Sequence, residues 1–393
     1  MKIRRSLIAG AIAFALTLAA SHLRSTPYNN YVLFANAILH GRLWIDWPGP
    51  YIDAVLWNGH RYIVNDPFPG LLMLPFVTLW GVAANQTFLA VILCAVGVGA
   101  AWELCERLDC TPGVAAWLCA FYLIGSDLLW CSMLGDVWFI AQTAAVACMT
   151  LALVELAGRN RMWLVMLLYA GAVASRFTVI MAAPAVAYIC LAGGLRGDGR
   201  IRWNWATFKV PLAQLFAVIV PAALLWCWYN VARWGVPWDS GHTIFFHQDS
   251  IGSVTGSPFA IANVPYQLQS FFVQYPDFAN AWPWIRPSYS GVALTWTAPA
   301  LLLAFLARRP HRLVIALWAA VLLAAGPSLL YYVNGFAQYG MRHALDFIPF
   351  LFVLMIIGVR RKLPLWGSVL ITYSCLAQLY GVWYWNAIVR PGN

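Results

Sequence analysis

The chain has 393 residues, of which 62% are hydrophobic and only 10% charged, and its mean hydropathy is +0.71. Because soluble domains carry about 25% charged residues, this composition excludes a soluble protein and predicts one embedded in a membrane. The formal net charge of +10 does not indicate nucleic-acid binding, since Lys and Arg stand in short clusters between apolar spans and form no basic stripe.

Eleven apolar segments are near or somewhat below the ~20 residues that a helix needs to cross a bilayer. In chain order, the predicted spans are 5–22, 86–105, 114–130, 137–156, 162–175, 178–194, 210–230, 291–307, 313–333, 347–359 and 364–384. The fifth and sixth are short and can also form one kinked unit. The first also resembles a signal peptide, but we interpret it as an uncleaved helix, and the remaining topology is the same either way.

The basic residues predict the orientation of these spans. Sixteen of the 24 Lys and Arg fall in short connections on one side: Lys2, Arg4, Arg5, Arg107, Arg159, Arg161, Arg196, Arg200, Arg202, Lys209, Arg308, Arg309, Arg312, Arg360, Arg361 and Lys362. Because cytoplasmic loops are enriched in Lys and Arg, the N-terminus is predicted inside and the C-terminus outside. Residues 1–393 are therefore expected to form a single all-α membrane domain.

Two long loops, 23–85 and 231–290, are predicted to face outward. Six of the seven histidines and most aspartates lie on that side, so groups able to transfer protons are concentrated there. Within the first loop, 29–43 has apolar residues at helical spacing and 71–82 is apolar, but both are too short to cross. We expect two helices lying at the outer membrane interface, joined by the polar stretch "WNGHRYIVNDPF".

Six motifs along the chain resemble, in order and topology, the C-type polytopic membrane glycosyltransferases, a superfamily that includes protein mannosyltransferases and aminoarabinose transferases. They are "NNYVLFANAILHGRL" (29–43), "NGHRYIVNDPFPGLLMLP" (58–75), "LGDVWFIAQ" (134–142), "ASRFTVIMAAP" (174–184), "YNVARWGVPWDSGH" (229–242) and "YGMRHALDFIPFL" (339–351). The resemblance implies transfer of a sugar from a polyprenyl-phosphate carrier to an acceptor at the outer face, with inversion at the anomeric carbon.

The resemblance also locates the acids of the site. The family usually has acids at the start of the first outer loop, where this chain has Tyr28, Asn29 and Asn30. Its Lys-Pro-Pro or His-Pro-Pro element corresponds to Asn65-Asp66-Pro67, and its second outer acid corresponds to Asp136. The missing early acid leaves the identity of the catalytic base open.

Glycosyl transfer to a hydroxyl requires a base, and the candidates are Asp66, Asp53 and Asp136, with Asp46 also in the loop. Asp66 is placed first because Pro67 restricts the backbone before it, which fixes the carboxylate. Solvated or helix-capping roles are the alternatives, and Asp136 is equally suited to cap the fourth span.

The leaving phosphate requires cations, and Arg176 and Arg342 each stand beside apolar sequence, as phosphate-binding arginines do. Snorkelling of Arg176 and an i,i+4 pair of Arg342 with Asp346 are the alternatives. His60, Arg61, His343, Asn29 and Asn30 are further candidate substrate-binding residues. No Asp-x-Asp or Cys/His spacing supports a metal site, so no cofactor is predicted beyond the lipid-linked donor.

The sequence thus predicts an inverting glycosyltransferase of a bacterial cytoplasmic membrane, acting on a polyprenyl-phosphate sugar and a glycan, lipid or protein acceptor. A transporter or flippase of a lipid-linked saccharide is one alternative, although such a protein needs polar groups near mid-bilayer. A catalytically inactive partner subunit is another, because the early acid is absent.

Overall fold

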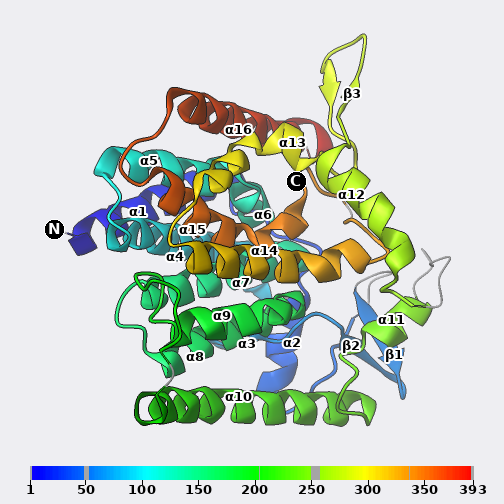
Figure 1. Ribbon diagram of the computed structural model, residues 1–393. Coiled ribbons are helices and arrows are strands. Elements are labelled where there is room, and N and C mark those ends of the chain that lie inside the picture. The colour runs from blue at the N-terminus through cyan, green and yellow to red at the C-terminus, as the bar shows by residue number, and fades with distance from the viewer. Residues whose placement is uncertain (1, 48–52, 203, 249–256, 336, 391–393) are drawn as a thin grey trace.

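A computed structural model describes residues 2–47, 53–202, 204–248, 257–335 and 337–390, which fold mostly into helices (Figure 1). Five described helices are long and apolar enough to cross a membrane. They are α4 (Gln86–Arg107), α7 (Val137–Leu156), α10 (Trp205–Trp234), α14 (His311–Leu330) and α16 (Leu365–Tyr384), the last continued by the π-helical turn η7 (Trp385–Val389). These five coincide with predicted spans.

A sixth candidate span is bent in the middle. Helix α5 (Pro112–Ala120) runs into the π-helical turn η2 (Phe121–Gly125) and then bends by 46° into α6 (Leu128–Leu134). The polar pair Ser126 and Asp127 stands at the break, where Ser126 Oγ donates to the Tyr122 carbonyl oxygen at 2.6 Å.

Four of the remaining predicted spans correspond to shorter apolar helical stretches. These are residues Arg5–Ser21 of α1 (Lys2–Ser21), α8 (Met162–Val173), η3 (Phe177–Ala182) with α9 (Ala183–Leu191), and α15 (Ile348–Val359). The predicted span 291–307 is not one helix: it divides into α13 (Leu294–Thr297) and the 3-10 helix η5 (Pro299–Leu306). Ala298, whose φ is −143°, breaks it because a residue before proline avoids the helical conformation. The total of eleven spans therefore stays a prediction.

Helix α7 is the centre of the bundle, and nearly all of its side chains are buried. It packs against α4 where Gly97 lies opposite Ala147, because a Cβ on Gly97 would come within 3.6 Å of the Ala147 Cα. Small residues allow membrane helices to approach this closely. The rigid α7 holds Trp138, near its start, and Gln142 in fixed positions.

The loop 23–85, here called the first outer loop after its predicted side, contains the two predicted helices. They are α2 (Asn30–Leu39) and α3 (Phe68–Trp80), the latter followed by η1 (Gly81–Ala83). Between them, β1 (Ala54–Trp57) pairs antiparallel with β2 (His60–Ile63), a hairpin that was not predicted. Asn58 and Gly59 have φ of +49° and +79°, which suits a two-residue hairpin turn. The polar stretch is therefore a strand pair above the bundle and not a simple linker.

The second outer loop contains α11 (His242–Gln248), η4 (Ile261–Asn263), α12 (Val264–Phe272) and a short hairpin of β3 (Asp277–Phe278) with β4 (Ile285–Arg286). The two outer loops meet at β1, where the Gln248 side chain accepts from Leu56 N–H and donates to the Leu56 carbonyl oxygen. The 3-10 helix η6 (Arg342–Asp346) lies between α14 and α15.

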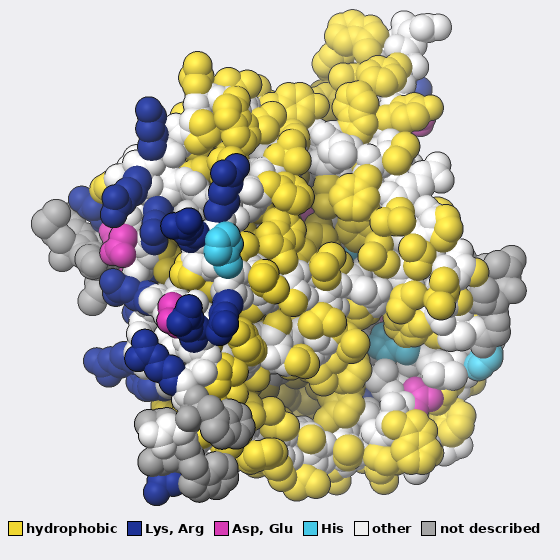
Figure 2. All heavy atoms as spheres, in the orientation of Figure 1, with side chains coloured by type: hydrophobic (Ala, Val, Ile, Leu, Met, Phe, Trp, Pro, Cys, Tyr) yellow, Lys and Arg dark blue, Asp and Glu magenta, His cyan; other side chains and the backbone are white. Residues whose placement is uncertain are grey.

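Charged residues occupy one end of the bundle. Figure 2 shows most of the visible Lys and Arg side chains gathered at the end that holds the N-terminus, while hydrophobic side chains cover most of the remaining surface. That end includes the C-terminal end of α7, followed by Arg159 and Arg161, and the N-terminal end of α14, which contains Arg312. All nine cysteines are free.

Candidate active site

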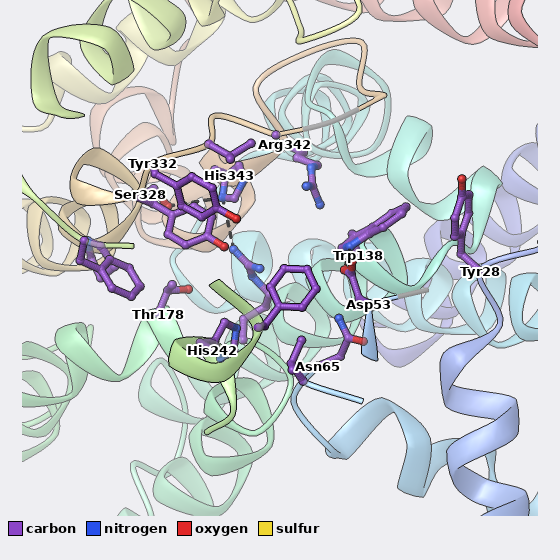
Figure 3. Close-up of a pocket in the computed structure, with 18 residues that line it drawn as sticks. Tyr28, Asp53, Asn65, Trp138, Thr178, His242, Ser328, Tyr332, Arg342 and His343 are labelled. Carbon is purple, nitrogen blue, oxygen red and sulfur yellow. Dashed lines mark hydrogen bonds between the residues drawn. The ribbon is translucent and has the colours of Figure 1, made fainter. Parts of the chain in front are cut away.

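A cavity of about 490 Å³ lies between the two outer loops and the bundle. Its walls come from the start of α7, the start of η3, the end of α14, η6, α11 and the segments flanking the β1–β2 hairpin. In Figure 3 the labelled side chains from these distant segments converge on one space. The cavity is at the N-terminal end of α7 and the C-terminal end of α14, opposite the basic clusters on the same helices.

One wall carries the only carboxylate lining the cavity among the described residues, Asp53. Its Oδ2 accepts a hydrogen bond from the indole Nε1 of Trp138, and the residue is buried. Asn30 holds the neighbouring backbone, since its Nδ2 donates to the Asp53 carbonyl oxygen at 3.3 Å and to Asn65 Oδ1 at 3.1 Å. Asp53 is thus a positioned carboxylate that faces the cavity.

Arg342 of η6 enters the cavity from the opposite wall (Figure 3). Its Nε donates to Gln338 Oε1 at 3.0 Å, and its carbonyl oxygen accepts from Gln142 Nε2 at 3.1 Å. Its Nη1 is buried and has no hydrogen-bond partner among the described residues. Burial lowers the pKa of Arg342 to about 10, helped by the nearby Arg176, so the side chain stays cationic at neutral pH.

Arg176 also lines the cavity, but its guanidinium is already paired. Nε and Nη2 donate to the two carboxylate oxygens of Asp346 at 3.2 and 2.9 Å, and Nη2 lies 3.3 Å from His343 Nδ1. Thr178 Oγ1 donates to the same carboxylate at 2.9 Å. The i,i+4 pair of Arg342 with Asp346, which was the alternative to phosphate binding, is not formed, because Asp346 instead binds Arg176 from 170 residues away.

Two histidines complete the polar lining. His343 lies beside Arg176, and burial among two arginines lowers its pKa well below the usual value. His242, at the start of α11, receives or donates a hydrogen bond at 2.8 Å with Ser240, and burial lowers its pKa to about 4. Both rings are therefore neutral at neutral pH, because burial and the nearby arginines disfavour their protonated forms.

Asp66 lies next to the cavity but is not part of its lining. Its Oδ2 accepts from the Phe177 backbone N–H at 2.7 Å, which holds the start of η3, while its buried Oδ1 has no partner among the described residues. Burial raises the pKa of Asp66 to about 6, against the opposing effects of the Phe177 hydrogen bond and Arg176. It thus ties the first outer loop to the segment that follows Arg176.

Asp136 lies outside the cavity and its carboxylate is fully engaged. Thr26 Oγ1 donates to Oδ1, and Arg390 donates to both oxygens, at 2.8 Å for the Nη2–Oδ2 bond. Asp136 stands at the N-cap position of α7, but its side chain makes no capping bond. It joins the first outer loop to the C-terminal end of the chain.

The remaining predicted binding residues divide into near and distant ones. Asn30 supports the Asp53 segment, whereas Asn29 has a buried Oδ1 without a partner among the described residues. His60 is exposed and stacks on Trp44 at 4.4 Å, and Arg61 forms part of the hairpin, its carbonyl oxygen accepting from Ile45. None of Asn29, Asn30, His60 and Arg61 lines the cavity.

Sequence reasoning missed Trp138, Thr178 and His242 as individual site residues. All three stand within motifs that carried the family resemblance, so motif membership was the available signal. It also missed Asp127, which is buried inside a predicted span. Its carboxylate lies next to Gly340, and Gly340 stands two residues before Arg342 in the chain. No group of three or more His, Cys, Asp or Glu side chains suited to a metal occurs in the described part of the chain.

The helical bundle with its cavity at one end is similar in fold to a solved membrane-protein structure. It matches the crystal structure of ArnT from Cupriavidus metallidurans bound to undecaprenyl phosphate, with a TM-score of 0.55 and 13% sequence identity. The match covers 97% of this chain and 66% of that one, so this chain spans about two thirds of its length. Since ArnT is an aminoarabinose transferase, the predicted resemblance is confirmed at the level of the fold. No family model and no curated protein matches the chain.

Proposed function

We propose that the chain is a membrane glycosyltransferase that transfers a sugar from a polyprenyl-phosphate donor to a glycan, lipid or protein acceptor of the cell envelope. The observation that carries the proposal is a cavity of about 490 Å³ whose lining includes both buried cations, Arg176 and Arg342, and the positioned carboxylate of Asp53. A sugar linked through phosphate needs this pairing of cation and acid, and the matched ArnT structure contains a lipid phosphate.

The cationic wall suits the leaving phosphate. Arg342 has a buried Nη1 without a partner among the described residues, and burying an unpaired charge is costly unless a ligand compensates it. Arg176, fixed by Asp346, supplies a second positive charge to the same wall. As the bond between the anomeric carbon and the phosphate oxygen breaks, these two guanidinium groups stabilise the developing negative charge.

The opposite wall suits the acceptor. Its hydroxyl attacks the anomeric carbon from the side facing Asp53, which takes the proton, and single displacement inverts the anomeric centre. Asp53 replaces Asp66 as the first candidate base, because Asp53 lines the cavity whereas Asp66 binds the Phe177 backbone. His242 is neutral and lines the same cavity, so it is the second candidate.

The position of the cavity supports action at the outer face of a bacterial cytoplasmic membrane. It lies at the opposite ends of α7 and α14 from Arg159, Arg161 and Arg312, and Lys and Arg are enriched on the cytoplasmic side. A transporter would need a polar route along the bundle. Towards the end of α7 away from the cavity, most buried side chains are apolar, with Thr150 and Glu155 as exceptions, which favours surface chemistry.

The test is release of polyprenyl phosphate by the purified protein, with a panel of polyprenyl-phosphate sugars and lipid or glycan acceptors. Acceptor-dependent release that disappears in Asp53→Asn is expected. Donor binding without release in every combination would overturn catalysis and favour the inactive-subunit alternative. Movement of intact donor across proteoliposome membranes without release would favour a flippase.

A further inference from the structure

Helix α12 exposes apolar side chains and buries two polar ones. Tyr266, Leu268 and Phe272 are 46%, 42% and 52% exposed, whereas Gln267 and Ser270 are each 1% exposed on the inner side, next to the buried Phe271. Gln267 Nε2 donates to the Tyr331 carbonyl oxygen at 2.7 Å, and Ser270 Oγ accepts from Asn334 at 3.1 Å. A water-facing helix buries its apolar side, so the outer side of α12 is suited to an apolar environment.

The β3–β4 hairpin next to α12 has the same character. Trp282 and Trp284 near its tip are 59% and 60% exposed, and Phe278 is exposed as well. In Figure 1 the hairpin projects sideways from the bundle, across the direction of α14 and α16, and Figure 2 shows hydrophobic side chains gathered on it. If α14 and α16 cross a membrane, the hairpin therefore runs along the membrane surface.

The hairpin also continues a surface that faces lipid. The outward side of α16 exposes Val369, Leu376 and Leu379, as a membrane-crossing helix does. At the far end of α16, Tyr380 Oη donates to the Ile285 carbonyl oxygen, and the Trp282 and Trp383 rings lie 5.4 Å apart. The exposed rings of Trp282, Trp284 and Trp383 thus continue the exposed side of α16 at the C-terminal end of this helix. The basic residues 360–362 lie at its other end.

We infer that α12 and the β3–β4 hairpin form a membrane-surface anchor, embedded in the lipid–water interface of the leaflet at the cavity end. Its partner is the phospholipid surface itself. Trp and Tyr rings favour this depth because an apolar ring can enter the acyl region while its polar group reaches the headgroups. Asp277 and Arg286, which lie opposite each other in the β3–β4 register at the end of the hairpin nearest the bundle, remain at headgroup level. This inference does not depend on the proposed catalytic function.

The test places a nitroxide spin label at position 281, which is exposed at the hairpin tip, through Ala281→Cys in the full chain. The protein is reconstituted in vesicles of phosphatidylethanolamine and phosphatidylglycerol. Collision with oxygen, which concentrates in lipid, is compared with collision with a water-soluble nickel complex. Leu376→Cys is the lipid reference and His60→Cys the aqueous one, and the unmodified chain gives the background from its native cysteines.

Higher oxygen than nickel accessibility at position 281, between the two references, is the expected result. Adding Trp282→Ser and Trp284→Ser should then shift the label towards the nickel value, because the rings that hold the tip in lipid are gone. A nickel accessibility equal to that at position 60 would overturn the inference. Low accessibility to both reagents would also overturn it, since that pattern means that protein covers the hairpin.

Discussion

Replacing Arg342 by Gln should weaken binding of polyprenyl phosphate by about 10- to 100-fold. Gln keeps a polar group near Gln338 but removes the charge and the Nη1 donor, which has no partner among the described residues. A hydrogen bond to a charged group contributes about 1.5–3 kcal/mol, and each 1.4 kcal/mol is a factor of ten in affinity. Lys should restore only part of the loss, because an ammonium group lacks the planar fork that matches phosphate.

The loss of affinity should occur without loss of stability. Burial lowers the pKa of Arg342 to about 10, which shows that the fold disfavours the charge when no ligand is bound. Binding of polyprenyl phosphate to the purified protein and the midpoint of thermal unfolding are the two measurements. Arg107→Gln is the matched control, since Arg107 pairs with Glu103 at 2.7 Å on α4, away from the cavity. An unchanged dissociation constant in Arg342→Gln, or an equal loss in Arg107→Gln, would refute the assignment.

Three further predictions concern the acids and the topology. Asp53→Asn should lower turnover by about 10²-fold or more while donor affinity is kept, whereas Asp66→Asn should retain most turnover. Single-turnover kinetics measures both variants. If turnover is instead lost in Asp66→Asn and kept in Asp53→Asn, Asp66 is the base. The pKa of Asp66 is about 6 when folded and 3.8 as the ordinary value, so wild-type stability should fall as pH rises from about 4 to 6. Asp66→Asn removes this penalty of up to about 3 kcal/mol. The thermal unfolding midpoint of the variant, relative to that of wild type, should therefore rise between about pH 4.5 and 7.5. A difference between the two midpoints that does not change with pH would contradict this. Cysteine at position 200 should react with a membrane-impermeant maleimide only from the cytoplasm and at position 60 only from outside, and the opposite result would invert the topology.

The spans were predictable because their signal is local. A window of about 20 apolar residues is sufficient to recognise α4, α7, α10, α14 and α16, since hydration alone decides where such a segment lies. The hairpin was also locally encoded, because Asn58-Gly59 between two short strand-forming runs is a strong turn signal, although the polar residues around it also suit functional groups of a site. The division of 291–307 at Pro299 was visible for the same local reason.

The partners of the charged residues were not predictable in this way. Arg176 and Asp346 are 170 positions apart, and Asp136 pairs with Arg390 from 254 positions away. Sequence spacing allowed a pair between Arg342 and Asp346 as the alternative to phosphate binding. However, η6 is a 3-10 helix, in which residues three apart align and residues four apart do not. Which cation remains available to a ligand therefore depends on tertiary contacts, and the structure leaves the Nη1 of Arg342 in that position.

The same reasoning separates the two aspartates of the first outer loop. Pro67 was expected to fix the Asp66 carboxylate for catalysis, but in the structure that carboxylate binds the start of η3 through the Phe177 N–H. Asp53 was ranked lower because it follows a segment rich in Gly and Pro, yet Asn30 and Trp138 hold it from two other elements. Rigidity at a reactive group thus comes from side chains that pack and donate across the fold, and a proline beside it is neither necessary nor sufficient.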